Sequence, residues 1–181
     1  NQMTGPADNA ELVVKMLNSR APGVMLGLED SMANTWSNLQ QGYNNIAGAL
    51  TGTLSYEKEG CKIPIETDSI IWVRPRGLHM IQIVNGLVTS APLFDMFNLI
   101  LGLDVTKLRH PLCIYIPKTE SAEEGLWWAD LFKTLSNYLK VPDNFIKCMA
   151  LIESFPIASQ MPSLIENLRH HILGLNFGRW D

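Results

Sequence analysis

The sequence predicts an α/β fold, a (β/α)8 TIM barrel of which about five to six βα units fit into 181 residues. Short apolar segments alternate with amphipathic segments along the chain, which is typical of a parallel sheet covered by helices. An open doubly wound sheet is the alternative. It needs a phosphate-binding glycine turn, and neither GxGxxG nor GxxxxGK occurs here. Because a closed barrel typically takes about 250 residues, we expect part of one barrel.

Five apolar segments are predicted to be strands because they are short and lie between turn residues. They are residues 24–28, 70–73, 112–116, 145–152 and 172–177. Thr4, Gly5 and Pro6 suggest the end of one more strand, lying just outside the chain. Asn85-Gly86, flanked by apolar residues, predicts a β-hairpin within residues 79–90.

Five further segments have apolar residues at three- and four-residue spacing, which predicts amphipathic helices. They are residues 9–19, 35–50, 93–103, 122–140 and 161–171. The side chains that this spacing places in the core are Leu12, Val13, Met16, Leu17, Trp36, Leu39, Tyr43, Ile46, Ala47, Trp127, Trp128, Phe132, Leu135, Tyr138 and Leu139.

Composition excludes several classes of protein. The net charge of −4 and the lack of a basic run argue against a nucleic-acid partner. No stretch approaches the 18 apolar residues of a transmembrane helix, so we expect no membrane span. The three cysteines, Cys61, Cys113 and Cys148, have no metal-binding spacing and are predicted to be free thiols. The histidines also lack ligand spacing and are expected at the surface or at helix ends; they are His79, His110, His170 and His171.

A charged group follows every predicted strand. In parallel α/β folds ligands bind beyond the carboxyl ends of the strands, so five such ends in succession predict a charged site on one face of the barrel. The residues concerned are Glu29, Asp30, Ser31, Arg74, Arg76, Lys118, Glu120, Glu153, Arg179, Trp180 and Asp181.

Two acidic residues, Glu153 and Asp181, each end an apolar run and suggest a site for a hard cation such as Mg²⁺. Their alternative roles are helix caps or rim salt bridges. Arg74 suits an oxyanion, because guanidinium binds carboxylate and enolate oxygens with two donors. The alternative for Arg74 and Arg76 is a structural ion pair with Glu29 or Glu120.

Two other groups near these strand ends also leave alternatives open. Lys118 suggests a phosphate contact, a Schiff base or an ion pair on the rim. The segment Gly178-Arg179-Trp180 presents backbone N–H groups that an anion could accept.

Several motifs, in order along almost the whole chain, resemble the malate synthase family in its short bacterial and glyoxysomal form. The matching segments are Leu28-Glu29-Asp30-Ser31 with Thr35-Trp36, Val73-Arg74-Pro75-Arg76-Gly77-Leu78-His79, Leu93-Phe94-Asp95, Ile116-Pro117-Lys118 with Glu120-Ser121, Leu151-Ile152-Glu153, and Gly174-Leu175-Asn176-Phe177-Gly178-Arg179-Trp180-Asp181. The most specific of these segments are the Val-Arg-Pro-Arg-Gly block at residues 73–77 and the Gly-Leu-Asn-x-Gly-Arg-Trp-Asp block at residues 174–181.

The resemblance implies Mg²⁺-dependent condensation of glyoxylate with acetyl-CoA and water to give malate and CoA. It implies that Glu153 and Asp181 bind Mg²⁺ and that Glu29 and Asp30 surround metal-bound waters. Arg74 would stabilise the negative oxygen that develops during the reaction. Backbone groups of Gly178, Arg179, Trp180 and Asp181 would hold the glyoxylate carboxylate.

This sequence departs from the family pattern in two ways. Gly27 stands where the family usually has an aspartate, which is expected to weaken metal binding. The family's catalytic base is an aspartate in a C-terminal helical domain beyond residue 181. We therefore expect residues 1–181 to be one partial barrel domain, without the N-terminal domain, the last barrel strands and that helical domain, and to be inactive alone.

Two alternative functions remain open. One is a non-catalytic malate-synthase-like chain that binds Mg²⁺ and a small 2-oxo acid, and the other is a related malyl-CoA or citramalyl-CoA lyase. An unclosed parallel sheet also exposes edges and an apolar face, so we expect the isolated chain to self-associate. A bacterial cytoplasm and a glyoxysome or peroxisome both agree with the resemblance.

Overall fold

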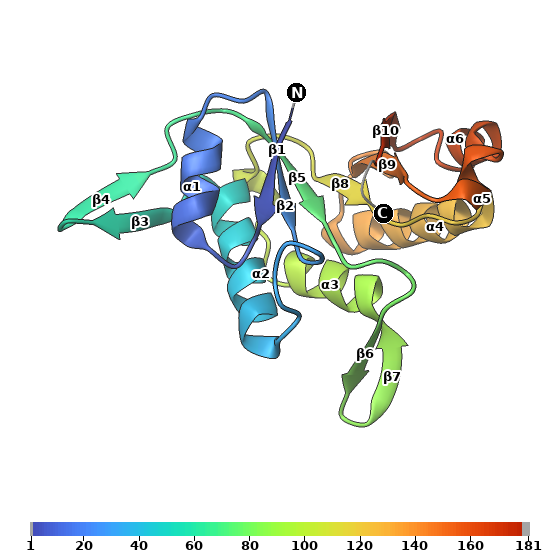
Figure 1. Cartoon of the computed structure of the whole chain (residues 1–181), viewed down its shortest axis with the longest axis horizontal. Helices are drawn as coiled ribbons and strands as arrows, with labels where there is room; N and C mark the ends of the chain where they lie inside the picture. Colours follow the sequence, from blue (N-terminus) through green and yellow to red (C-terminus); the bar gives the residue numbers. More distant parts are fainter. Residues whose placement is uncertain (1, 179–181) are drawn as a thin grey trace.

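The computed structural model describes residues 2–178 and contains one parallel six-stranded sheet with helices packed against it (Figure 1). Its strands, in spatial order, are β1 (Gln2–Pro6), β2 (Gly23–Gly27), β5 (Ile70–Arg74), β8 (Cys113–Ile116), β9 (Lys147–Ile152) and β10 (Ile172–Phe177). Each new strand adds on the same side of the one before it, as in a barrel. A doubly wound sheet would reverse this order partway, so the barrel prediction is confirmed.

The five predicted strands are present, and the sequence prediction erred on a sixth. Residues 2–6 form β1 within the chain, in register with β2 from Gln2 opposite Gly23 to Pro6 opposite Gly27. Sequence reasoning placed this strand just outside the chain, with Thr4, Gly5 and Pro6 at its end, because Gly5 and Pro6 interrupt the apolar pattern. Among the described residues, β1 and β10 form the two edges of the sheet, so the barrel is not closed there.

Six α-helices and one short 3₁₀-helix connect the strands in the described part of the chain. They are α1 (Ala10–Asn18), α2 (Trp36–Leu50), α3 (Ala91–Ile100), η1 (Val105–Lys107), α4 (Ala122–Leu139), α5 (Phe155–Ala158) and α6 (Met161–Asn167). Local chemistry fixes their ends. Asn9 and Thr35 cap α1 and α2 by accepting backbone N–H groups, and Lys140 ends α4 in the left-handed region at φ 57°.

Two hairpins project from the body (Figure 1). The predicted one consists of β6 (Ile81–Val84) and β7 (Leu87–Ser90), and its turn residues Asn85 and Gly86 have φ of 50° and 80°. Two successive positive φ angles define the tight turn that Asn-Gly favours. The other hairpin, β3 (Ser55–Lys58) with β4 (Cys61–Pro64), was not predicted, since its strands are polar and short.

Side chains of the central strands alternate between two clusters, as the two-residue period of a strand requires. Val24, Leu26, Ile71 and Val73 join the main core together with helix residues. The intervening residues form a second cluster on the other face, which is the barrel interior. These inner-face residues are Met25, Trp72, Cys113, Tyr115 and Leu151, with Met149 packed against them.

Several sequence expectations need correction. Leu12, Trp36 and Tyr138 are 39%, 55% and 59% exposed, whereas the spacing placed all three in the core. His171 is buried, its ring packing on Phe132, and burial lowers its pKa. The last helix ends at Asn167 instead of His171, because a turn at Arg169 and His170 leads directly into β10. Cys113 and Cys148 are buried free thiols, as predicted, and Cys61 is an exposed one.

Candidate functional site at the carboxyl ends of the strands

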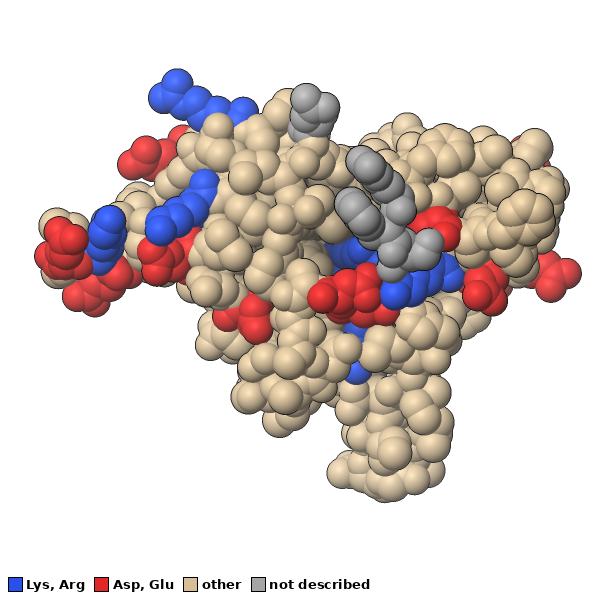
Figure 2. All heavy atoms as spheres, in the orientation of Figure 1, with Lys and Arg blue, Asp and Glu red and all other residues tan. Residues whose placement is uncertain are grey.

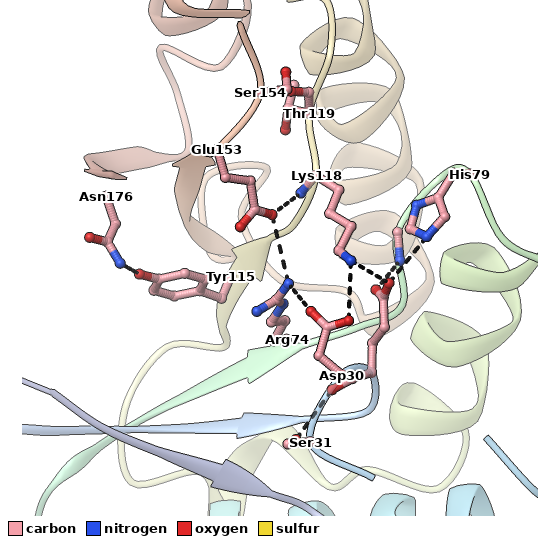
Figure 3. Close-up of polar contacts among 12 residues, drawn as sticks. Asp30, Ser31, Arg74, His79, Tyr115, Lys118, Thr119, Glu153, Ser154 and Asn176 are labelled. Carbon is pink, nitrogen blue, oxygen red and sulfur yellow. Dashed lines mark hydrogen bonds and ion pairs between the residues drawn. The ribbon is translucent and has the colours of Figure 1, made fainter. Parts of the chain in front are cut away.

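Four of the predicted site residues, Asp30, Arg74, Lys118 and Glu153, meet at the carboxyl end of the sheet (Figure 3). Arg74 ends β5 and Glu153 follows β9, two residues after the inner-face residues Trp72 and Leu151. By strand periodicity both side chains belong to the barrel interior. Figure 2 shows acidic and basic side chains gathered next to one another in this region. The fold therefore brings residues 79 positions apart together at the mouth of the barrel.

Arg74 is held between two carboxylates. Its Nη2 atom lies 2.8 Å from Asp30 Oδ2 and 3.7 Å from Glu153 Oε1. The residue is only 9% exposed, so these ion pairs are shielded from solvent on most sides. Because the guanidinium is planar and always charged, its position and its charge are both fixed. Arg74 is thus ready to stabilise a negative oxygen without rearrangement of the site.

Glu153 is the most deeply buried carboxylate of this site, with 2% of its side chain exposed. Its Oε1 atom accepts the backbone N–H of Lys118 at 2.6 Å. Lys118 has φ of 48°, an uncommon backbone conformation for a lysine, and strain of this kind concentrates at functional sites. A charged carboxylate so buried requires donors of this kind.

Gly178 allows the chain after β10 to pass close to Glu153. A Cβ atom at this position would lie 2.6 Å from the Glu153 Cβ, so a glycine is required. The Gly178 N–H donates to the Ile152 carbonyl at 3.0 Å. The other residues predicted to contact an anion, Arg179, Trp180 and Asp181, lie outside the described residues.

Glu29 and Asp30 form the acidic side of the site. Glu29, 4% exposed, accepts the Gly77 N–H at 2.8 Å and pairs with His79 Nε2 at 3.2 Å. Lys118 Nζ lies 3.6 Å from Glu29 Oε1 and 3.1 Å from Asp30 Oδ1. Lys118 therefore forms an ion pair on the rim of the barrel, which is one of the roles that the sequence suggested.

Arg76 lies outside the site, although the sequence placed it among the charged strand ends. Its guanidinium and its backbone N–H bind Asp95 of α3, with Nη2 2.6 Å from Oδ1 and N 2.8 Å from Oδ2. Tyr43 of α2 donates to the same carboxylate at 2.6 Å. Burial lowers the pKa of Arg76, whereas its hydrogen bonds and ion pair with Asp95 raise it. Together these effects leave the pKa of Arg76 above its usual value. The partner of Arg76 is Asp95, not Glu29 or Glu120.

Gly27 sits next to Arg74 in the sheet, since the two residues are register partners of β2 and β5. By strand periodicity a side chain here would share the inner face with Met25. A Cβ atom at Gly27 would lie 3.0 Å from Ser31 Oγ and 3.4 Å from the Glu29 carbonyl oxygen. A larger residue fits only if the Ser31 hydroxyl moves by a few tenths of an ångström.

Below Arg74 and Glu153, the inner face forms an open cavity of about 460 Å³ between β1 and β10. Tyr115 and Asn176 line it, and the Asn176 amide donates to the Tyr115 hydroxyl. Burial raises the pKa of Tyr115, which keeps the phenol protonated at neutral pH. The sequence analysis did not identify Tyr115, Asn176 or His79 as site residues. Tyr115 could have been found, because strand alternation places it on the same inner face as Trp72 and Leu151.

The described residues, 2–178, contain no group of three or more His, Cys, Asp or Glu that could hold a metal ion. They contain no helix long and apolar enough to cross a membrane. Within residues 2–178, the carboxylates of Asp30 and Glu153 lie beside Arg74, and the second predicted metal ligand, Asp181, lies outside the described part.

These features define a parallel α/β barrel protein with a compact charged site at the carboxyl ends of its strands. Residues 70–181 match the family model described as malate synthase, TIM barrel domain. This match covers more than half of the chain, so the chain belongs to the malate synthase family.

Curated relatives agree along almost the entire sequence. Malate synthase A of Escherichia coli (strain K12) is 34% identical, and glyoxysomal malate synthase of Zea mays is 31% identical. Each match covers 99% of this chain but only 35% and 34% of the relative, so the chain spans about a third of their length. The structure of the Haloferax volcanii malate synthase lead(II) complex matches with a TM-score of 0.63 at 15% identity, covering 98% of this chain and 49% of that chain, which supports the fold.

Proposed function

We propose that this chain supplies the metal- and glyoxylate-binding part of a malate synthase. The reaction is the Mg²⁺-dependent condensation of glyoxylate with acetyl-CoA and water to give malate and CoA. One observation carries the proposal: in a chain of this family, Arg74 Nη2 lies 3.7 Å from the buried Glu153 carboxylate at the mouth of the barrel. A cation site and an oxyanion donor side by side suit a 2-oxo acid substrate.

The donor set fits Mg²⁺. This ion prefers oxygen ligands and usually takes one or two carboxylates, the rest being water or substrate oxygens. Glu153 supplies one buried carboxylate, and Asp181 is proposed as the second. Glu29 and Asp30 are proposed to hold metal-bound waters. When bound, Mg²⁺ would polarise the glyoxylate aldehyde as a Lewis acid.

Arg74 is the proposed catalytic residue of this chain. Condensation requires acetyl-CoA to pass through an enolate, whose oxygen is negative, and the aldehyde oxygen then becomes an alkoxide. A guanidinium fixed by Asp30 at 2.8 Å is already oriented, so its stabilisation of this developing charge costs no reorganisation. Lys118 and His79 serve a positioning role by fixing the Glu29 and Asp30 carboxylates.

The proton of the acetyl methyl group is proposed to leave to a base outside these 181 residues, as the family resemblance implies. Acetyl-CoA contacts are likewise not assigned to residues of this chain. We propose a bacterial cytoplasm, or a glyoxysome or peroxisome, as the compartment. These parts of the proposal rest on the family and not on the geometry of the site.

Two measurements test the proposal. Calorimetry on the 181-residue chain should detect glyoxylate binding that requires Mg²⁺, and the absence of heat from correctly folded protein would reject the binding role. A thiol assay on a protein with the length of the curated relatives should detect CoA release only when glyoxylate and Mg²⁺ are both present. Cleavage of malyl-CoA or citramalyl-CoA to acetyl-CoA and a 2-oxo acid, without release of thiol, would instead indicate a lyase.

A further inference from the structure

Residues 74–77, named here the linking segment, connect two parts of the candidate site. At one end Arg74 presents its guanidinium to the carboxylates at the mouth of the barrel. At the other end the Gly77 N–H donates to Glu29 Oε2 at 2.8 Å. Few torsion angles separate the two ends, because each residue has two soft backbone dihedrals and a proline, here Pro75, has its φ fixed by its ring. The conformation of the linking segment therefore sets where both groups lie.

The middle of the linking segment is bound to Asp95 through a side chain and through the backbone. Arg76 Nη2 lies 2.6 Å from Asp95 Oδ1, and the Arg76 N–H donates to Oδ2 at 2.8 Å. The guanidinium contact alone would complete a buried ion pair, so the bond to the backbone N–H is an additional constraint on the chain. Two consecutive peptide N–H groups thus donate to different carboxylates, that of Arg76 to Asp95 and that of Gly77 to Glu29.

Asp95 is itself held in place from several sides. It is fully buried on α3, and Tyr43 of α2 donates to its Oδ1 atom at 2.6 Å. The helix α3 packs against both α2 and the β6–β7 hairpin (Figure 1). Gln82 of that hairpin accepts a hydrogen bond from Arg76 Nη1 at 2.9 Å. A buried carboxylate bound by a guanidinium, a backbone N–H and a phenol cannot move without leaving a buried donor unpaired, so Asp95 is a rigid anchor.

We propose that Asp95 is a positioning residue, which acts through Arg76 to hold the linking segment in the conformation that the site requires. In the described part of the chain its polar partners are Arg76 and Tyr43, neither of which is proposed to bind substrate or metal. Any effect of Asp95 on the site therefore passes through the linking segment. The effect on turnover rests on the proposed function, whereas the effect on the Gly77 N–H rests on the geometry alone.

Hydrogen exchange of the Gly77 amide in the 181-residue chain tests the positioning role without any assay of activity. In Asp95→Asn we expect this amide to exchange at least tenfold faster than in the parent chain, beyond any acceleration of the amides of β8. The β8 amides belong to a central strand and report the change in global stability. An unchanged Gly77 amide relative to those of β8 would overturn the proposal.

Two further variants separate positioning from loss of stability. Leu135→Ala removes a buried side chain from α4 and should accelerate Gly77 exchange only as much as that of the β8 amides. Tyr43→Phe keeps the Asp95 charge but loosens the carboxylate, and it should accelerate Gly77 exchange by about fivefold, the effect of one lost hydrogen bond. Because Tyr43→Phe is a mild change, it replaces Asp95→Asn in every measurement if the latter does not fold.

A double-mutant cycle with Arg74→Lys, in a protein of the relatives' full length, tests the effect on turnover. We expect Asp95→Asn to lower the kcat of the folded enzyme about tenfold in the parent, but less than twofold in the Arg74→Lys background, because residues that act through one another are not additive. Additive losses, or a lower Tm with unchanged kcat, would assign Asp95 to stability alone and contradict the proposal. If the parent releases no thiol, the proposed function fails, and Gly77 exchange still decides the positioning role.

Discussion

Arg74 and Glu153 lie two strands apart in the sheet, yet Arg74 Nη2 is 3.7 Å from Glu153 Oε1. The pair spans β8, which lies between β5 and β9, and Lys118, two residues after β8, donates its backbone N–H to the same carboxylate oxygen. Three neighbouring strand ends thus converge on one carboxylate. This arrangement gives a carboxylate with 2% side-chain exposure both a cationic partner and a hydrogen-bond donor, which a buried charge requires.

Substitution of Arg74 tests the oxyanion role. Lysine keeps the charge but loses the planar fork, so it cannot pair with Asp30 and Glu153 while also binding substrate oxygen. In a protein with the relatives' full length, we expect Arg74→Lys to lower kcat by about 10²–10³-fold, the usual cost of a lost oxyanion donor. Arg109→Lys, at the surface pair with Asp68, is the control and should keep full turnover. Equal turnover of both variants would refute the role.

Removal of the Glu153 charge tests the metal site. Glutamine has the same shape and can still accept the Lys118 N–H, so Glu153→Gln should fold normally. We expect Mg²⁺-dependent glyoxylate binding to weaken at least tenfold in calorimetry, because a neutral amide is a poor ligand for a hard cation. Glu166→Gln, which alters only an exposed pair with Arg169, should bind as the parent chain does. Undiminished binding in Glu153→Gln would place the metal elsewhere.

The buried Arg76–Asp95 pair should contribute to stability, since it joins the end of β5 to α3. Asp95→Asn leaves the Arg76 guanidinium buried without its counter-charge, which typically costs about 3–5 kcal/mol. Tyr43→Phe removes one hydrogen bond to the same carboxylate and should cost about 1 kcal/mol. Urea unfolding of the two variants measures both values. A loss in Asp95→Asn no larger than in Tyr43→Phe would contradict the ion-pair argument.

The cysteines predict a pH-dependent pattern of labelling. Burial raises the pKa of Cys113 to about 11 and that of Cys148 to about 12. The thiolate is the reactive form, and at pH 8 roughly one thiolate per thousand or fewer is present at each buried site. A thiol reagent should therefore modify Cys61 alone in the folded chain and all three cysteines in urea. Labelling of Cys113 should rise with pH up to about 11. In Cys61→Ser, rapid labelling at pH 8 would contradict the burial of the other two thiols.

Gly27 offers a gain-of-function test. An aspartate here would place a carboxylate beside Arg74, at the mouth of the barrel, once the Ser31 hydroxyl moves away from its Cβ. We expect Gly27→Asp to tighten Mg²⁺-dependent glyoxylate binding. Gly27→Ala adds the same Cβ without the carboxylate and should not do so. If both variants change binding equally, the effect is steric and the family's aspartate has no role in this chain.

The sequence predicted most of the fold because the controlling interactions are local. Strand and helix periods, the Asn85-Gly86 turn and the caps of α1 and α2 each depend on residues close together in the chain. Three polar or interrupted strands, β1, β3 and β4, were not predicted within the chain. These strands are stabilised by pairing with a neighbouring strand, so their residue pattern alone does not reveal them.

Sequence alone also identified Arg74, Glu153, Glu29 and Asp30 as strand-end residues, because parallel strands present their carboxyl ends at one face. Only the tertiary structure decided the partners. It assigned Arg76 to Asp95 instead of the site, tied Lys118 to Glu29 and Asp30, and brought His79 to Glu29. These contacts depend on distances of a few ångströms between segments remote in the sequence, and ionic attraction depends on such distances rather than on residue order.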